Sequence, residues 1–357
     1  MLGLKQAFAA TLAASFVIAA AGTADAASLK ITVVAAAPPQ VTNVKVTKEN
    51  FIPYVNEELK KSGQDFQIEW KEAYAGSLAT FNEVFEAIEE GIGQMGVILK
   101  NFEESKLPLD QYFYMVPFNR TTIPQMAEID NAMRKKIPEL NQAYLDHNQI
   151  MLGSGATEST DMFTTFQLKT VDDLKGHKIG ASGAMGHYMR GTGAVIVTSS
   201  MLDSYTSIRN GVYEGYPISI TLSGAYRTYQ AAKYFTTVNF GVSATSGLSV
   251  NKDTWGKLPD HAKKIFNDAT AKWAVWQADV DDARRGDYIK TMKEQGVQFG
   301  ELPPSERQRW AKMMPNIAKE WAENQEKKGI PAMKVLTAYM DELRGRNIEV
   351  ARQWDKE

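Results

Sequence analysis

The feature that most constrains this fold is a repeated alternation between strand-like and helix-like segments. Residues 29–34 (LKITVV), 66–70 (FQIEW) and 94–99 (QMGVIL) are short apolar runs typical of buried strands. Between them, residues 43–63 and 77–91 carry apolar side chains at helical spacing, and each segment ends at a glycine. Because strands that alternate with helices are typical of a parallel sheet covered by helices, we predict an α/β fold rather than a β-sandwich.

The same alternation resumes further along the chain and indicates a second unit. A helical pattern at 123–148, with Pro138 as a break, leads to a second set of strands and helices, and the chain from 258 onward is mostly helical. Two lobes of this kind usually bind a ligand in the cleft between them. The predicted lobes are 27–153 and 154–244, with part of 245–357 returning to the first lobe and a helical region, 258–357, bracing both.

The composition excludes several classes of function. The chain of 357 residues has a net charge of −2, so it lacks the basic excess of a nucleic-acid-binding protein. It has no cysteine, which excludes disulfides, thiol catalysis and zinc–thiolate sites. Residues 1–26 combine Lys5, an Ala-rich apolar run and a terminal Ala-Asp-Ala, which is the pattern of a secretory signal peptide. We therefore expect cleavage after Ala26 and a soluble protein in the periplasm.

Residues 170–186 (TVDDLKGHKIGASGAMG) resemble a phosphate-binding loop, because a strand-like segment runs into glycines. However, Gly180, Gly183 and Gly186 do not have the G-x-G-x-x-G spacing, and no Gly-Lys-Ser/Thr follows, so this stretch is not a nucleotide-binding loop. We interpret it as a tight turn from strand to helix, in which small residues, including Ser182, let a ligand or the other lobe approach the backbone. Backbone N–H groups at such a turn can bind an anion.

The sequence contains no recognisable enzyme or metal site. His147, His177, His187 and His261 lie in separate polar settings, and no G-x-S-x-G motif is present, so we do not expect a catalytic triad. The ten-residue separation of His177 and His187 is not a usual metal-ligand spacing. We therefore predict a protein without catalytic residues, cofactor or metal.

Five segments occur in one order along the chain: AGSLATFNEVFEAIEEGIGQMGV, VPF at 116–118, TVDDLKGHKIGASG, GTGAVIVTSSMLDSYTSIRNGVYEG and NKDTWGKLPDHAKKIFNDA. Together they resemble the DctP-type solute-binding proteins of tripartite ATP-independent periplasmic (TRAP) transporters. The resemblance implies a two-lobed periplasmic-binding-protein fold (type II-like) with mixed sheets, an interlobe ligand cleft and a helical C-terminal third. It implies a receptor that closes on a small organic acid and delivers it to membrane permease subunits, and we expect a monomer.

The resemblance also implies positions for the ligand-binding residues, and several of these positions have lost a polar group. The family arginine that pairs with the ligand carboxylate falls on Gly180, and a second arginine falls near Thr160. The other family contacts fall on Phe81, Leu99, Met201 and Ile218. A cleft that lacks two arginines would bind a dicarboxylate or sugar acid poorly, because a desolvated carboxylate without a partner is costly.

We therefore expect a solute with a larger apolar part, such as an aromatic or aliphatic monocarboxylate. Its anion would be held by the Gly183–Gly186 backbone turn, which Ser182 precedes, or by a displaced cation. Candidates for that cation are Lys100, Arg120, Arg190 and Arg227, although each of them alone also fits an exposed surface role. Asn239 lies where the family often places a polar contact on a crossover strand.

Two alternatives remain open at this point. A TRAP-type receptor for a neutral, zwitterionic or cationic solute would not need the arginines, and Glu158 and Asp161 could suit a cationic group. An enzyme of the periplasm on a similar scaffold would need a nucleophile with its base, or a metal site, and the sequence lacks both.

Overall fold

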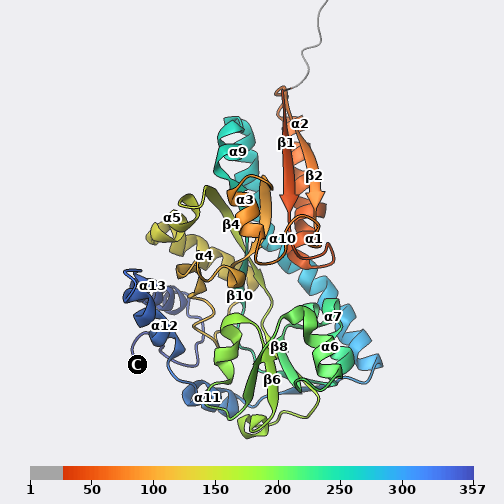
Figure 1. The fold of residues 1–357 in the computed structure, drawn as a ribbon, viewed down its shortest axis with the longest axis vertical. Helices are drawn as coiled ribbons and strands as arrows, with labels where there is room; N and C mark the ends of the chain where they lie inside the picture. Colours follow the sequence, from red (N-terminus) through yellow and green to blue (C-terminus); the bar gives the residue numbers. More distant parts are fainter. Residues whose placement is uncertain (1–26) are drawn as a thin grey trace, which may run out of the picture.

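The chain forms two lobes, each built around one β-sheet (Figure 1). The structure, a computed structural model, describes residues 27–357 except for the side chains of residues 27 and 243–245. The signal peptide that we predict at 1–26 lies outside the described residues. Both sheets mix parallel and antiparallel pairs and are covered by helices, so the predicted two-lobed α/β fold is confirmed.

The sheet of the first lobe has the order β2-β1-β3-β10-β4. β1 (Ala27–Val34) runs parallel to β2 (Phe66–Ala73) and β3 (Met95–Leu99), whereas β10 (Ser243–Asn251) is antiparallel to β3 and to β4 (Gln149–Thr157). The α-helices of this part of the chain are α1 (Thr42–Val46), α2 (Ile52–Lys61), α3 (Val84–Glu89), α4 (Ile123–Lys136) and α5 (Glu139–Leu145). Since β10 follows the second lobe in sequence, the first lobe is complete only when the chain returns.

The sheet of the second lobe has the order β11-β9-β5-β8-β6-β7. β5 (Asp161–Thr164) is antiparallel to β8 (Gly215–Ile218) and β9 (Tyr234–Thr237), while β6 (Lys178–Ala181) is parallel to β7 (Val195–Thr198) and β8. The helices of this lobe are α6 (Ser204–Arg209), α7 (Ile220–Tyr226) and α8 (Thr228–Ala231). Two short crossovers, residues 158–160 and 238–242, therefore join the lobes.

The chain after β10 is mostly helical and contacts both lobes. It comprises α9 (Lys252–Lys257), α10 (Asp260–Glu294), β11 (Gln298–Glu301), α11 (Pro304–Met313), α12 (Ile317–Glu326) and α13 (Ala332–Gly345). The long helix α10 crosses the molecule and packs on α1 and β4 of the first lobe and on α7 of the second (Figure 1). Strand β11 joins the second sheet beside β9, whereas α13 packs on α4 of the first lobe. Within residues 27–357, no helix combines the length and apolar character needed to cross a bilayer.

Local sequence signals set several element boundaries. Helix α4 begins at a capping box between Thr122 and Gln125. It ends at Lys136 because Pro138 disfavours the helical conformation of the residue before it, Ile137. The helix that we predicted over 77–91 is shorter and covers only α3. Its first part is a turn, in which the Glu83 carboxylate accepts hydrogen bonds from the Thr80 backbone N–H and hydroxyl at 2.8 and 2.6 Å.

Candidate functional site

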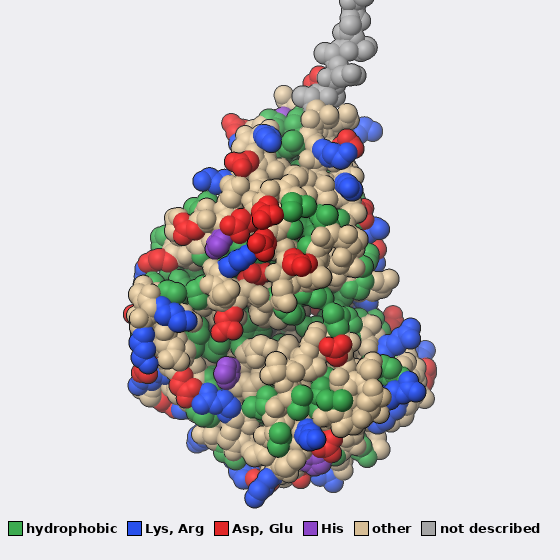
Figure 2. Space-filling model, viewed as in Figure 1, with side chains coloured by type: hydrophobic (Ala, Val, Ile, Leu, Met, Phe, Trp, Pro, Cys, Tyr) green, Lys and Arg blue, Asp and Glu red, His purple; other side chains and the backbone are tan. Residues whose placement is uncertain are grey.

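Both lobes line a narrow cleft between them, in which about 50 Å³ is open to the centre of a water-sized sphere. The space-filling view shows the molecule hollowed between its lobes, with hydrophobic side chains along the hollow (Figure 2). The first lobe contributes Ala37, Val41, Asn43, Leu99, Asn101, Tyr114 and Thr157 to the lining. The second lobe contributes Thr160, Ser182, Met185, Met201, Tyr216, Pro217, Ile218, Ser219, Leu222 and Tyr226. No lining side chain that the structure describes is charged.

The ends of three strands build most of this lining. Leu99 ends β3, Ser182 follows β6, and Ile218 ends β8 just before α7. Ligand sites in α/β folds usually lie beyond the carboxyl ends of such strands. The two lobes also touch beside the cleft, because the 3₁₀ helix η2 (Lys100–Phe102) packs against the 3₁₀ helix η5 (Gly183–Met189). The Tyr188 hydroxyl of η5 donates a hydrogen bond to the Tyr114 carbonyl at 2.8 Å.

Three uncharged polar atoms of the cleft are buried without a hydrogen-bond partner in the protein. They are Asn43 Oδ1, the Tyr114 hydroxyl and Ser182 Oγ. Burial raises the pKa of the Tyr114 hydroxyl well above its usual value, so this group stays protonated and able to donate. Since nearly all buried polar groups in folded proteins have a partner, we take these three atoms as candidate ligand contacts. The Tyr216 hydroxyl is a close neighbour of Ser182.

Gly180, where the family resemblance implies an arginine, lies against the ring of Tyr213 rather than against open space. A Cβ atom added at Gly180 would lie only 2.5 Å from the nearest atom of that ring. Tyr213 is fully buried, and its hydroxyl lies 3.1 Å from Ser199 Oγ. The Ser199 carbonyl in turn accepts a hydrogen bond from the Tyr216 hydroxyl of the cleft at 3.0 Å. Tyr213 therefore fills the space that a side chain at position 180 would need, and Gly180 contributes no side chain to the lining.

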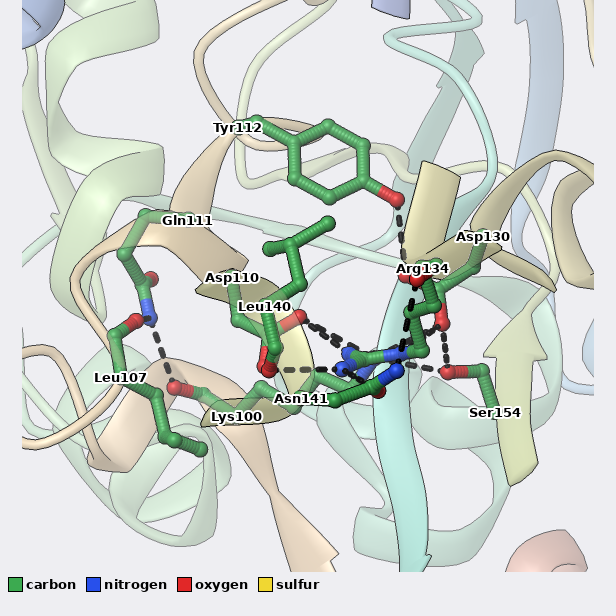
Figure 3. Close-up of polar contacts among 10 residues, drawn as sticks. All are labelled: Lys100, Leu107, Asp110, Gln111, Tyr112, Asp130, Arg134, Leu140, Asn141 and Ser154. Atoms are coloured by element: carbon green, nitrogen blue, oxygen red, sulfur yellow. Dashed lines mark hydrogen bonds and ion pairs between the residues drawn. The ribbon is translucent and has the colours of Figure 1, made fainter. Parts of the chain in front are cut away.

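Lys100, one of the four candidate cations, is enclosed in a buried polar cluster next to the cleft wall (Figure 3). Its Nζ donates to Ser154 Oγ at 2.8 Å and lies 3.5 Å from Asp130 and 3.7 Å from Asp110. Arg134 pairs with the same two carboxylates, with 2.7 Å between its Nε and Asp130. Although burial alone would raise the pKa of Asp130, Arg134 and Lys100 hold it well below its usual value. Two cations thus balance two carboxylates, and Lys100 has no charge to offer a ligand.

The other three candidate cations also lie outside the cleft lining. Arg190 pairs with Glu320, with 2.5 Å between Nη1 and Oε2. Arg120 pairs with Glu349 at 3.2 Å. Arg227 is exposed, with φ of 60° at the junction between α7 and α8.

The polar residues that we singled out on the crossovers hold the backbone together instead of facing the cleft. Asp161 accepts hydrogen bonds from the backbone N–H groups of Val238 and Asn239 at 2.9 and 2.7 Å, and thereby ties one crossover to the other. The Asn239 side chain accepts a hydrogen bond from Ser159 Oγ at 2.8 Å. Glu158 pairs with Arg285 of α10 at 2.7 Å. Neither carboxylate is therefore available to a cationic solute.

The remaining predicted site residues lie in or beside the cleft. Leu99, Ser182, Met201, Ile218 and Thr160 are part of its lining. Phe81 stacks on Phe102 at 5.1 Å and borders a small depression that adjoins the cleft at Asn43 and Leu99. Gly183 faces the Asn101 carbonyl, which would lie 3.6 Å from an added Cβ.

Several lining residues were not identified from the sequence, among them the two tyrosines that the second lobe contributes. These residues are Asn43, Tyr114, Tyr216, Leu222 and Tyr226. None belongs to a motif of its own. For Tyr216, Leu222 and Tyr226, the position directly around strand β8 and its following helix was the available signal.

The sequence model of the DctP family, described as bacterial extracellular solute-binding protein, family 7, matches residues 37–325. The chain belongs to the DctP family. The members of this family are solute receptors, so the prediction that the chain is not an enzyme is confirmed. A search of curated proteins finds no match.

Solved structures of DctP-type proteins share the fold at low sequence identity. A TRAP solute-binding protein from Rhodoferax ferrireducens T118, in complex with copurified benzoate, has a TM-score of 0.75 and 16% identity, and the match covers 89% of this chain and 98% of that chain. DctP7, a Bordetella pertussis extracytoplasmic solute receptor binding pyroglutamic acid, has a TM-score of 0.71 and 19% identity, with 88% and 99% covered.

A third structure of this kind is a marine metagenome TRAP solute-binding protein specific for aromatic acid ligands, in complex with 3-hydroxybenzoate. It has a TM-score of 0.73 and 14% identity, and the match covers 89% of this chain and 99% of that chain. At such identities these likenesses show that the fold is shared.

Proposed function

We propose that this DctP-family protein is the extracytoplasmic receptor of a TRAP transporter. It captures a small organic solute with an apolar or aromatic part and delivers that solute to the membrane permease. The observation that supports this most directly is the cleft itself, which both lobes line with apolar and uncharged polar side chains. Closure of the lobes about the two crossovers would shield the solute from water and shift the protein from open to closed states.

The shape of the lining supports a solute with a substantial apolar body. Met185, Met201, Ile218 and Leu222 form an apolar wall on the second lobe. Methionine side chains are flexible and polarisable, and they pack well against aromatic rings. Tyr216 adds an aromatic face that a planar solute can stack on.

The sequence left two solute classes open: a monocarboxylate with an apolar part, and a neutral, zwitterionic or cationic solute. The benzoate and 3-hydroxybenzoate bound by structural neighbours favour a monocarboxylate with an aromatic part. The absence of a charged side chain from the described lining favours the second class, a neutral solute.

A thermal-shift screen of the purified protein tests the proposal. The panel contains aromatic and aliphatic monocarboxylates, neutral aromatic compounds, dicarboxylates, sugar acids, polyols and betaines. We expect solutes with an apolar or aromatic part to raise the melting temperature, because a ligand that binds only the folded state stabilises it. A shift produced only by dicarboxylates, sugar acids or polyols would contradict the proposed solute. Chemical turnover of a binding solute would overturn the receptor role.

The genes beside the coding sequence provide an independent check on the transporter. A TRAP system requires two adjacent membrane proteins, one small and one large. Their absence, together with genes for an ATP-driven importer, would contradict the TRAP assignment while leaving the cleft as a solute site.

A further inference from the structure

The three unpartnered polar atoms of the cleft define the kind of chemistry that can fill it. Asn43 is only 5% exposed and Tyr114 only 1% exposed, yet Asn43 Oδ1 and the Tyr114 hydroxyl have no partner in the protein. Ser182 Oγ also lacks a partner of standard geometry, although the Tyr216 hydroxyl lies close to it. A carboxamide and two hydroxyls offer both donors and acceptors but carry no charge. A solute that satisfies them must therefore present neutral hydrogen-bonding groups beside its apolar body.

These atoms come from both sides of the cleft. Asn43 lies in α1, and Tyr114 lies between β3 and α4, both in the first lobe. Ser182 lies between β6 and η5 in the second lobe. A solute that hydrogen-bonds to all three would connect the two lobes, and it would therefore favour the closed state over the open one.

Three charged side chains next to the lining in sequence, Lys100, Glu158 and Asp161, are engaged elsewhere, whereas Arg227, which follows Tyr226, is exposed. Lys100, between Leu99 and Asn101, is neutralised in its buried cluster with Asp110 and Asp130. Glu158, which follows Thr157, is paired with Arg285 at 2.7 Å.

Polar groups near Asn43 also have partners elsewhere in the protein. Its neighbour Thr42 donates a hydrogen bond from its hydroxyl to Asp281 of α10 at 2.5 Å. Two backbone N–H groups at the start of α7 are also taken, since the Thr221 N–H donates to Glu158 and the Leu222 N–H to Ser219 Oγ. A carboxylate in the cleft would lose its hydration without gaining a counter-charge.

We propose that the cleft recognises an uncharged solute, with an apolar body and a carboxamide, lactam or hydroxyl group that bridges Asn43 and Tyr114 of the first lobe to Ser182 of the second. This inference rests on the proposed function and names the solute class of the same site. Burying a neutral polar group costs less hydration free energy than burying an ion does. The hydroxyls and the carboxamide of the cleft can form the hydrogen bonds that such a neutral group needs.

Matched pairs of probes that differ in charge but not in shape test the proposal by isothermal titration calorimetry at pH 7.5. The pairs are benzamide with benzoate, phenylacetamide with phenylacetate, and pyroglutamide with pyroglutamate. We expect the neutral member of at least one pair to bind at least tenfold more tightly than its acid. If the acids bind equally or more tightly, this inference is wrong and the receptor function stands. If no probe and no solute of the thermal-shift panel binds, both this inference and the proposed function are wrong.

Substitutions then test whether the named atoms make the contacts. Tyr114→Phe and Ser182→Ala each remove one hydroxyl, and we expect each to weaken binding of the preferred neutral probe roughly three- to tenfold, as the loss of one neutral hydrogen bond does. Tyr144→Phe is the matched control, because Tyr144 is also fully buried but lies outside the cleft. Equal affinities in Tyr114→Phe, Ser182→Ala and Tyr144→Phe, with unchanged folding, would overturn the proposed recognition.

Discussion

Arg285 and Glu158 join the long helix α10 to the first crossover between the lobes, with 2.7 Å between the guanidinium and the carboxylate. The other oxygen of Glu158 accepts a hydrogen bond from the backbone N–H of Thr221, at the start of α7, at 2.5 Å. One carboxylate thus connects α10, the crossover and a helix that lines the cleft. This connection lies at the crossover by which the chain passes from the first lobe to the second.

We expect Glu158→Ala to lower the free energy of unfolding more than Arg285→Ala does. Removing the carboxylate leaves the buried Thr221 N–H without its partner, which costs about 1–3 kcal/mol. Arg285 is partly exposed, so its loss removes a largely screened ion pair worth about 1 kcal/mol or less. Urea unfolding of both variants measures the difference. A larger loss in Arg285→Ala would show that the ion pair, rather than the backbone hydrogen bond, holds this junction.

We expect Lys100→Met to destabilise the protein by about 3–5 kcal/mol, because it leaves the buried carboxylates of Asp110 and Asp130 with one cation instead of two. Lys334→Met is the matched control, since Lys334 forms an exposed pair with Glu139. That substitution should change stability by less than about 0.5 kcal/mol. Chemical unfolding of the two variants checks this prediction, and similar values for both would mean that the buried cluster contributes little.

Gly180→Ala should destabilise the protein by about 1–3 kcal/mol, because the new methyl group overlaps the Tyr213 ring. Gly286→Ala in α10, where an added Cβ meets nothing within 4 Å, should be neutral or stabilising by up to about 1 kcal/mol. In a double-mutant cycle, the cost of Gly180→Ala should shrink when Tyr213 is also replaced by Ala. An unchanged cost in the Tyr213→Ala background would disprove the contact between these two residues as its cause.

The stability of the protein should fall as the pH rises from about 4 to about 7, and Asp281 should contribute to that fall. Burial raises the pKa of Asp281 to about 7, although a hydrogen bond from Thr42 opposes this shift. The pKa of an aspartate in the unfolded chain is about 3.9. In this window the folded state keeps a proton that the unfolded state releases, so the free energy of unfolding decreases with pH. The slope for one such group is at most about 1.4 kcal/mol per pH unit.

Asp281→Asn removes that proton while it keeps a hydrogen-bond acceptor for Thr42. The variant should therefore lose less stability than the wild type between pH 5 and pH 7.5, as measured by thermal unfolding at both values. Asp161, whose pKa burial also raises to about 7, keeps its own contribution in both proteins. Parallel pH profiles for the variant and the wild type would show that Asp281 does not titrate in this range.

The alternation of strands and helices predicted the two lobes because each element carries its own periodicity. The strands that the pattern did not predict are those whose partners lie far away in sequence. β10 is the clearest example, since its small residues would not suggest a strand inside a sheet, paired on both sides. An added Cβ at Gly247 of β10 would lie 2.7 Å from Met151 of β4, so close packing demands the small residue there.

The cleft could be predicted only in part from the sequence. Leu99, Met201 and Ile218 were placed by the family resemblance and Ser182 by the turn after a strand, and all four are in the lining. The sequence could not indicate that Lys100 is enclosed, because Asp130 lies on another element and reaches it only through tertiary packing. Asn43 and Tyr114 were missed because they too reach the cleft only through tertiary packing.

The most direct test of the central claim is whether filling the cleft abolishes solute binding. Met201→Trp places a bulky ring in the lining, whereas Leu202→Trp changes the next residue, which is exposed and does not line the cleft. Isothermal titration calorimetry with benzamide and with the best solute of the thermal-shift panel should give one site per chain in the wild type and in Leu202→Trp. We predict at least tenfold weaker binding in Met201→Trp. Undiminished binding in folded Met201→Trp would contradict the assignment of this cleft as the solute site.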